Sequence, residues 1–346
     1  METEAHIITE KQGALGLVTL NRPRALNALT RGMCLGLEKA LAAWAADDSI
    51  KSVAIRGAGD RAFCAGGDIR AMAESASAGT TAAAGFLADE YRTNAAIGAF
   101  PKPYVALWRG IVMGGGAGVS VHGCHRLADA SLTFAMPETA IGFIPDVGAS
   151  YFLSRCPGMT GLYLGLTGAR IGAGDALYLG LATAAFSAVR HDALLEKLAG
   201  GEEAQSAIAS LQDAPPPAPI AERQREIDTL FSAPSMEMVL ERLDRDGGPF
   251  ASECAAAIRA RSPLSAKLAF AAFHRGRTLS RNECLKMEYR IGARAVMAPD
   301  FREGVRTQLV DKGASPHWNP PQFAGISDDM VAAHFATLGP RELVLD

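Results

Sequence analysis

Two acidic residues stand in an otherwise apolar stretch near the middle of the chain. Glu138 follows Pro137, and Asp146 follows a second proline a few residues later. Burial among apolar neighbours disfavours the charged form of a carboxyl group and raises its pKa toward neutrality. Such a group can act as a general base, a general acid or a nucleophile on an acyl carbon. As structural alternatives, Glu138 could cap the turn after Pro137, and Asp146 could be the N-cap of a helix beginning near Val147.

Two glycine-rich loops lie closer to the N-terminus, each directly after a predicted strand. They are residues 61–70 (RAFCAGGDIR) and 112–118 (VMGGGAG). The first N–H groups of a helix have no partner within it, and glycine has no Cβ to keep a ligand away. A thioester carbonyl that gains negative charge needs such donors aimed at one point. The two loops could therefore form an oxyanion hole from the N–H groups of Gly67 and Gly115.

Two other interpretations of the glycine loops stay open. Neither loop is a G-x-G-x-x-G sequence, and neither ends in Gly-Lys-Ser/Thr, so a nucleotide-phosphate cradle has little support. Either loop by itself could also be a close-packed turn with no chemistry. Their combination with Glu138 and Asp146 favours a site for acyl chemistry.

The segments that must position these residues predict an α/β fold. Residues 6–21 are typical of two short strands around a turn, and Thr30 is placed to N-cap a helix that extends to about Ala46. Further strands are expected at 52–57 and 103–108, each followed by glycine. The repeated order of strand, glycine loop and helix indicates crossover connections between parallel strands.

Changes in composition predict how the chain is divided. Residues 72–85 are crowded with Ala, Ser, Thr and Gly, and we expect a mobile loop there. Residues 213–219 (DAPPPAP) predict a stiff linker or a surface crossing. Because 346 residues are more than one core usually serves, we expect a core with the active site at 1–212 and a mostly helical region at 213–346.

Charge, cysteines and hydropathy exclude several classes of function. The 34 basic and 37 acidic residues give a net charge of −3, which creates no general field for nucleic acid. The six cysteines are scattered without a CxxC pair, so we expect free thiols in a reducing compartment and no metal site. No run of about 18 apolar residues predicts a membrane span. The acidic residues 1–8 argue against a secretory or transit peptide, and the expected location is cytoplasmic.

Four motifs in combination resemble the crotonase (enoyl-CoA hydratase/isomerase) superfamily. In that family's order and spacing they are residues 21–29 (NRPRALNAL), 62–69 (AFCAGGDI), 113–116 (MGGG) and 134–138 (FAMPE). The resemblance implies an α/β fold, a crotonase-like spiral of ββα units with a helical C-terminal region, that binds an acyl-CoA between the glycine loops. It places the oxyanion donors at Gly67 and Gly115 and the CoA contacts near Arg24, Ala65 and Gly66.

One departure from the family pattern bears on the activity. Hydratases of this family work with two glutamates, and the position that matches the first of them is Gly118 in this chain. Glycine has no side chain that could hold or deprotonate a water. Glu138 matches the second glutamate. Hydration of an enoyl-CoA by the two-glutamate route is therefore disfavoured.

The sequence instead resembles the 3-hydroxyisobutyryl-CoA hydrolase branch of the family over residues 18–318. The motifs that carry this resemblance are residues 89–94, 120–123, 136–148, 287–290, 300–306 and 311–318. The branch implies hydrolysis of a short branched 3-hydroxyacyl-CoA thioester, as in valine degradation. It also places substrate or catalytic roles on Glu90, Gly115, Glu138 and Asp146.

The resemblance implies a mechanism with two variants. Glu138 would activate a water, or would itself attack the carbonyl to give a mixed anhydride that water opens. Asp146 would hold the substrate's 3-hydroxyl group or pass a proton toward the departing CoA thiolate, and Glu90 would contact the acyl end. No separate cofactor is expected, because CoA is part of the substrate.

Two rival functions fit the same motifs. The first is an enoyl-CoA isomerase or hydratase-type enzyme, in which CoA stays attached to the acyl group. The second is a non-catalytic acyl-CoA-binding protein of the same fold, although a binder would need neither Glu138 nor Asp146. The expected partner is an acyl-CoA, with no nucleic acid and no membrane. The wider family often forms trimers, so a homo-oligomer is left open.

Overall fold

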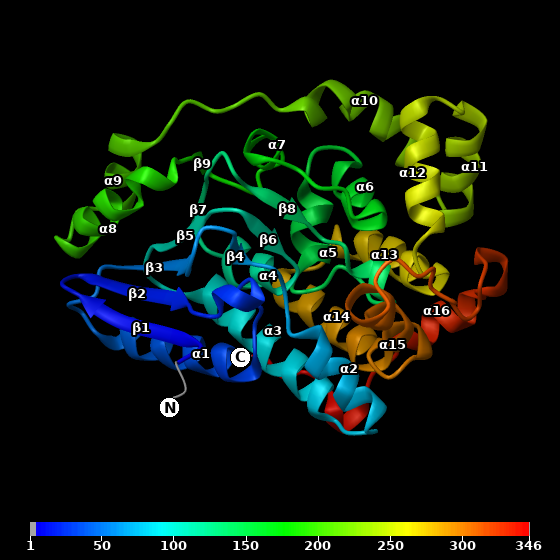
Figure 1. Ribbon diagram of the computed structural model, residues 1–346, viewed down its shortest axis with the longest axis horizontal. Helices are drawn as coiled ribbons and strands as arrows, with labels where there is room; N and C mark the ends of the chain where they lie inside the picture. The colour runs from blue at the N-terminus through cyan, green and yellow to red at the C-terminus, as the bar shows by residue number, and fades with distance from the viewer. Residues whose placement is uncertain (1–4, 346) are drawn as a thin grey trace. The chain divides into compact units, whose positions relative to one another are not determined.

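The computed structural model describes residues 5–345 (Figure 1). Residues 1–4, which carry part of the acidic start, lie outside the described residues. The chain divides into two compact units, each assembled from three segments. The first unit consists of the chain up to Gly67 with Arg92–Phe134 and Arg170–Ala221. The second consists of Asp68–Tyr91, Ala135–Ala169 and the chain from Glu222 onward.

The first unit contains a six-stranded sheet. Its strands are β1 (Ile7–Gln12), β2 (Leu15–Leu20), β3 (Ser52–Gly57), β5 (Tyr104–Trp108), β7 (His125–Ala128) and β9 (Ala184–Ala185). They lie side by side in this same order. β1 and β2 form an antiparallel hairpin, and the remaining neighbours are parallel. Every residue of β2 and β5 is buried, as is usual for strands covered on both faces.

Helices cover both faces of this sheet. The helices of the first unit are α1 (Arg31–Ala46), α4 (Gly115–Val121), α7 (Ala173–Tyr178), α8 (His191–Ala199) and α9 (Ala204–Leu211). Leu17 and Leu107 pack in one apolar cluster with Leu194 of α8. Because successive strand residues alternate between faces, Gly16 meets the other helix layer, where an added Cβ would lie 2.7 Å from the ring of Trp44 in α1.

A smaller sheet positions the glycine loops. Its three strands are β4 (Ala62–Cys64), β6 (Ile111–Met113) and β8 (Thr133–Ala135), in the order β4-β6-β8. β4 and β6 pair in parallel. Parallel neighbours run in the same direction, so the loops that follow β4 and β6 begin at the same edge of the sheet.

The second unit is predominantly helical. Its helices include α2 (Ile69–Ser77), η2 (Glu138–Ile141), α5 (Ala149–Phe152), α6 (Thr160–Thr167), α11 (Met236–Asp246), α12 (Pro249–Arg259), α13 (Pro263–Gly276), α14 (Arg281–Ala295), α15 (Pro299–Val305) and α16 (Asp328–Phe335). Two further helices, α3 (Ala82–Ala99) and α10 (Pro219–Phe231), each begin in one unit and end in the other. No strand follows Ala185 within the described residues. Among them, moreover, no helix has the length and apolar content needed to cross a bilayer.

Several local predictions are confirmed. The hairpin at 6–21 and the strands at 52–57 and 103–108 are present as β1 and β2, β3 and β5. α1 begins after Thr30, whose side chain accepts a hydrogen bond from the N–H of Met33, and ends at Ala46. The predicted division between residues 212 and 213 stays a prediction. The two compact units interleave along the chain, so neither corresponds to one continuous stretch that could test it.

The predicted mobile loop at 72–85 is wrong. Most of this stretch belongs to α2 and α3, and only residues 78–81 lie between the two helices. Asp68 caps α2 by accepting from the N–H of Ala71. Ser75 closes the junction, because its hydroxyl accepts from the N–H of Ala83. Alanine is the best helix former, and its abundance here outweighs the serines and glycines.

Candidate active site

The two glycine loops of the first unit pack against each other. A Cβ added to Gly116 would lie 2.2 Å from the carbonyl oxygen of Cys64, and one added to Gly66 would lie 3.5 Å from that of Met113. The backbone at Gly66 has a φ of +119°, in the region that favours glycine. Gly115 is the first residue of α4, where backbone N–H groups have no partner within the helix. The loops that carry Gly67 and Gly115 are thus held together without intervening side chains.

The predicted CoA contacts adjoin the first glycine loop. The N–H of Ala65 donates to the carbonyl of Leu26 at 3.0 Å, and the N–H of Leu29 donates to that of Gly66 at 2.8 Å. Arg24 lies on the same turn and is exposed. Arg24, Ala65 and Gly66 therefore belong to one continuous piece of the first unit. The arrangement leaves the Arg24 guanidinium accessible to an anionic ligand.

Buried Asn27 fixes this turn, a function that the sequence did not reveal. Its side-chain amide donates to the carbonyl oxygens of Ala58 and Ala62, at 3.0 and 2.9 Å, and its oxygen accepts from the N–H of Arg22 at 3.0 Å. Leu26 and Asn27 both have positive φ, which is unfavourable for residues other than glycine. The three hydrogen bonds offset that cost.

Six carboxyl groups are buried among the described residues of the second unit, and four of them influence one another electrostatically. Glu90 is 2% exposed, Glu138 8%, Asp146 5% and Glu288 0%. The first three are the acidic residues predicted from the sequence. Glu288, in α14, was not predicted, although the helix offers a signal. A glutamate occupies the buried face of α14, which also contains Leu285 and further residues at helical spacing: Cys284, Ile291 and Gly292.

Asp146 and Glu138 are not helix caps. The N-cap of α5 is Gly148, without a side-chain hydrogen bond, and the carboxylate of Asp146 instead accepts a 2.6 Å hydrogen bond from the hydroxyl of Tyr91. No side chain caps η2, in which Glu138 is the first residue. Oε2 of Glu138 and Oε1 of Glu90 are buried and have no hydrogen-bond partner among the described residues. Each of these two oxygens is therefore a buried acceptor whose hydrogen-bonding capacity is unused within the described residues.

Burial raises the pKa of all four carboxyl groups. It raises the pKa of Asp146 to about 7 and that of Glu288 to about 8. For Glu90 and Glu138 burial is again the largest cause, and the negative charge of Asp146 raises their pKa further. Because the ionisation of one group raises the pKa of the others, the cluster holds protons near neutral pH. The predicted shift toward neutrality is confirmed for Glu138 and Asp146.

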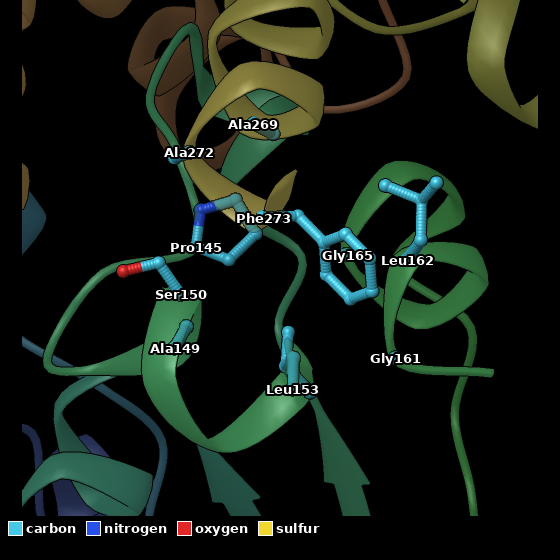
Figure 2. A pocket seen from close by; sticks show the side chains of 10 residues that line it. All are labelled: Pro145, Ala149, Ser150, Leu153, Gly161, Leu162, Gly165, Ala269, Ala272 and Phe273. Carbon is cyan, nitrogen blue, oxygen red and sulfur yellow. The ribbon is translucent and has the colours of Figure 1, made fainter. Parts of the chain in front are cut away.

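A small apolar cavity adjoins the turn after Asp146 (Figure 2). Its walls come from the α5 region, α6 and α13, and its lining residues are Pro145, Ala149, Ser150, Leu153, Gly161, Leu162, Gly165, Ala269, Ala272 and Phe273. Its volume of about 20 Å³ is enough for roughly one water molecule. The cavity is therefore a packing feature behind the turn and is too small for an acyl group.

Comparison with known proteins identifies the family. A family model described as enoyl-CoA hydratase/isomerase matches residues 15–335. The chain therefore belongs to the enoyl-CoA hydratase/isomerase family, and the resemblance and fold class predicted from the sequence are confirmed. Two curated relatives named "3-hydroxyisobutyryl-CoA hydrolase, mitochondrial" are 43% identical in Danio rerio and 39% in Homo sapiens. These alignments cover 99% and 97% of this chain, and 92% and 90% of the relatives.

Solved structures agree on the fold but carry other names. A carnitinyl-CoA dehydratase from Mycobacterium thermoresistibile is 39% identical, with a TM-score of 0.94 over 99% of both chains. An enoyl-CoA hydratase from Rhodobacter sphaeroides 2.4.1 is 38% identical, with a TM-score of 0.93 over 99% of this chain and 100% of its own. Names within the family therefore differ at nearly equal similarity, and the choice between activities depends on the site.

The predicted cytoplasmic location is wrong on this comparison. The curated relatives that match nearly the whole chain are named as mitochondrial proteins. The prediction relied partly on unpaired cysteines. Free thiols require only a reducing environment, which does not identify a compartment.

Proposed function

We propose that this protein hydrolyses the thioester of 3-hydroxyisobutyryl-CoA, a step of valine degradation, to 3-hydroxyisobutyrate and free CoA. The observation that carries the proposal is the buried pair of Glu138 and Asp146, both with raised pKa, in a chain that has Gly118 where a hydratase has its other glutamate. Curated relatives with the hydrolase name, 38–43% identical over nearly the whole chain, support the same activity.

The thioester oxygen is stabilised by backbone donors in this mechanism. The N–H groups of Gly67 and Gly115 donate to the oxygen as it gains negative charge. The close packing of the two glycine loops supports this role, because it fixes both donors before the substrate arrives. One such donor contributes on the order of 3 kcal/mol to transition-state stabilisation in an enzyme of another class.

Glu138 acts on the carbonyl carbon. It either takes a proton from the water that attacks the carbon, or attacks the carbon itself to give a mixed anhydride that water then opens. Either route consumes one water, breaks the C–S bond and releases one thiol. The unpartnered, buried Oε2 supports both routes, because no group of the described chain competes for it.

Asp146 holds the substrate's 3-hydroxyl group or returns a proton to the sulfur of the departing CoA. A pKa of about 7 supports either role, because both protonation states are then populated near neutral pH. The two residues are also electrostatically linked. The charge of Asp146 raises the pKa of Glu138, so Glu138 ionises more readily while Asp146 carries a proton. That distribution suits a base or nucleophile beside an acid.

The remaining site residues bind the substrate. We place CoA against Arg24, which is exposed, and against Ala65 and Gly66 of the adjoining glycine loop in the first unit. Glu90 contacts the acyl end, a role supported by its buried, unpartnered Oε1. CoA enters as part of the substrate and leaves as a free thiol, and the mechanism uses no separate cofactor.

Hydration or dehydration of an acyl-CoA is the second candidate function. It is favoured by the two solved structures named as a dehydratase and a hydratase, which match this chain at 39% and 38% identity. Against it stands Gly118, which cannot hold a water for the two-glutamate reaction.

The products of the wild-type protein distinguish the two candidates. We expect 3-hydroxyisobutyryl-CoA to yield free thiol, measured with a thiol reagent, and isobutyryl-CoA to react more slowly because it lacks the 3-hydroxyl group. With crotonyl-CoA, the absorbance of the conjugated thioester should persist. Loss of that absorbance without thiol release, together with no thiol from 3-hydroxyisobutyryl-CoA, would reject the hydrolase in favour of the hydratase.

A further inference from the structure

Glu288 is a completely buried carboxyl group for which the proposed chemistry has no use. It lies on α14 and contacts the turn that follows Asp146, 140 residues earlier in the chain. Its two oxygens accept three hydrogen bonds. The N–H of Gly148 donates to Oε2 at 2.6 Å, while the N–H and the hydroxyl of Ser150 donate to Oε1 at 2.8 and 2.6 Å.

The turn that receives these bonds has an unfavourable backbone conformation. Val147 has a φ of +54°, which for a β-branched residue is strained and costs on the order of 1–3 kcal/mol. Gly148 also has a positive φ, of +88°. Two successive residues after Asp146 are thus in the left-handed region. A conformation of this kind persists only where the surroundings impose it, and Glu288 binds the amides of Gly148 and Ser150 directly.

The start of this turn is held through the side chain of Asp146. Its carboxylate accepts from the hydroxyl of Tyr91 at 2.6 Å. The ring of Tyr91 meets that of Tyr289 edge to face, with centroids 6.3 Å apart. Tyr289 is the neighbour of Glu288 on α14. One helix therefore supports both the backbone after Asp146 and the tyrosine that binds its carboxylate.

We propose that Glu288 is a positioning residue, whose two carboxyl oxygens hold residues 147–150 in their strained turn and thereby orient the carboxyl group of Asp146. This inference rests on the proposed function for the role of Asp146. Glu288 lies far from Asp146 in the sequence. It affects the reaction by fixing the turn, and it does not contact the substrate.

The substitution Glu288→Gln tests the proposal with little change in volume. A side-chain amide offers one acceptor oxygen and an NH₂ group, so at least one N–H donor of the turn would face another donor. We expect kcat for thiol release to fall about 10- to 100-fold, because displacing a reacting group by about 1 Å can cost that much. KM should stay within about threefold, since Glu288 does not contact the substrate. Glu241→Gln, an exposed glutamate of α11, is the matched control.

Hydrogen exchange supplies a readout that does not depend on turnover. In the wild-type protein the amides of Gly148 and Ser150 should exchange slowly, and in Glu288→Gln they should exchange at least about tenfold faster while those of α13 do not change. If the wild type releases no thiol but the two amides still exchange faster in Glu288→Gln, the proposed function is rejected. The structural role of Glu288 in the turn is then still supported. Unchanged exchange at both amides, or a folded Glu288→Gln with the kcat of Glu241→Gln, overturns the positioning role.

Ser150→Ala covers the case in which Glu288→Gln does not fold. This variant removes the hydroxyl bond and leaves both backbone donors of the turn. A severalfold lower kcat at unchanged KM, with a normal cooperative unfolding transition, supports the proposal. A kcat equal to that of wild type would contradict it.

Discussion

At the scale of single residues, Asp146 lies at the electrostatic centre of the buried cluster. Its negative charge raises the pKa of Glu90, Glu138 and Glu288. In the other direction, the hydroxyl of Tyr91 donates to Asp146 and opposes part of the rise that burial causes in its pKa. This hydrogen bond therefore influences the protonation of the cluster, whose pKa values are raised mainly by burial.

Tyr91→Phe should raise the pKa of Asp146 above its value of about 7. The hydroxyl stabilises the ionised carboxylate, so its removal favours the protonated form. We expect the inflection of the pH profile of kcat/KM that belongs to Asp146 to move to higher pH, whether the reaction needs the acid or the base form. The profile of the surface variant Tyr178→Phe should match wild type. An inflection that stays in place or moves to lower pH in Tyr91→Phe would contradict this prediction.

The sequence was sufficient to predict the burial of two acidic residues, Glu138 and Asp146, but not their partners. Glu138 and Asp146 stand among apolar neighbours in the chain, and the direction of their pKa shifts follows from that context. Tyr91 and Glu288 contact the Asp146 segment from positions 55 and 140 residues away. Both residues belong to motifs that carry the family resemblance, but local spacing holds no information on contacts at such separation, so these contacts were not predicted. The catalytic and binding roles themselves stay predictions.

At the scale of elements, the parallel pairing of β4 and β6 places the two glycine loops together. The sequence predicted the loops, because each glycine run follows a strand. Their close approach depends on glycine at particular positions, and it is tightest at Gly116, where a Cβ would overlap the carbonyl of Cys64.

Gly116→Ala should destabilise the fold and separate the loops. The added methyl group would lie 2.2 Å from a backbone oxygen, so the backbone must move, at a cost of about 1–3 kcal/mol. We expect a lower urea midpoint and a loss of thiol release larger than the loss of folded protein. Gly85→Ala is the matched control, because nothing lies within 4 Å of its added Cβ. In α3 it should raise stability by about 0.5–1 kcal/mol. Equal activity of the two variants would count against the role of the loops.

The helices α2 and α3 show where composition misleads. Serine, threonine and glycine between residues 72 and 85 suggested a loop, yet alanines and two local hydrogen-bonded junctions produce two helices there. Capping by Asp68 was visible in the sequence as an acidic residue just ahead of Ile69. The sequence did not show whether this cap would outweigh the glycines that follow it.

At the scale of the whole molecule, the predicted class of fold is confirmed, and the predicted division at 212 and 213 stays a prediction. The repeated order of strand, glycine loop and helix indicates an α/β core, and the family model over residues 15–335 agrees. The interleaving of both compact units along the chain was not predictable. A proline-rich linker marks a local stiff segment, whereas the membership of a unit depends on long-range packing.

Similarity of the whole molecule fixes the family but not the reaction. Relatives and solved structures at about 40% identity are named as a hydrolase, a dehydratase and a hydratase. For this chain, the hydrolase proposal depends on the site, through the absence of a side chain at Gly118 and the buried pair of Glu138 and Asp146. A test of the proposed mechanism must therefore change one residue of that pair.

The most direct test is steady-state thiol release from 3-hydroxyisobutyryl-CoA by Glu138→Gln, compared with wild type and with Glu241→Gln. The amide keeps the shape of the side chain but can act neither as a base nor as a carboxylate nucleophile. We predict a kcat at least about 100-fold below that of wild type, with a normal unfolding transition, and wild-type activity for Glu241→Gln. A folded Glu138→Gln protein that releases CoA at the wild-type rate would contradict the mechanism.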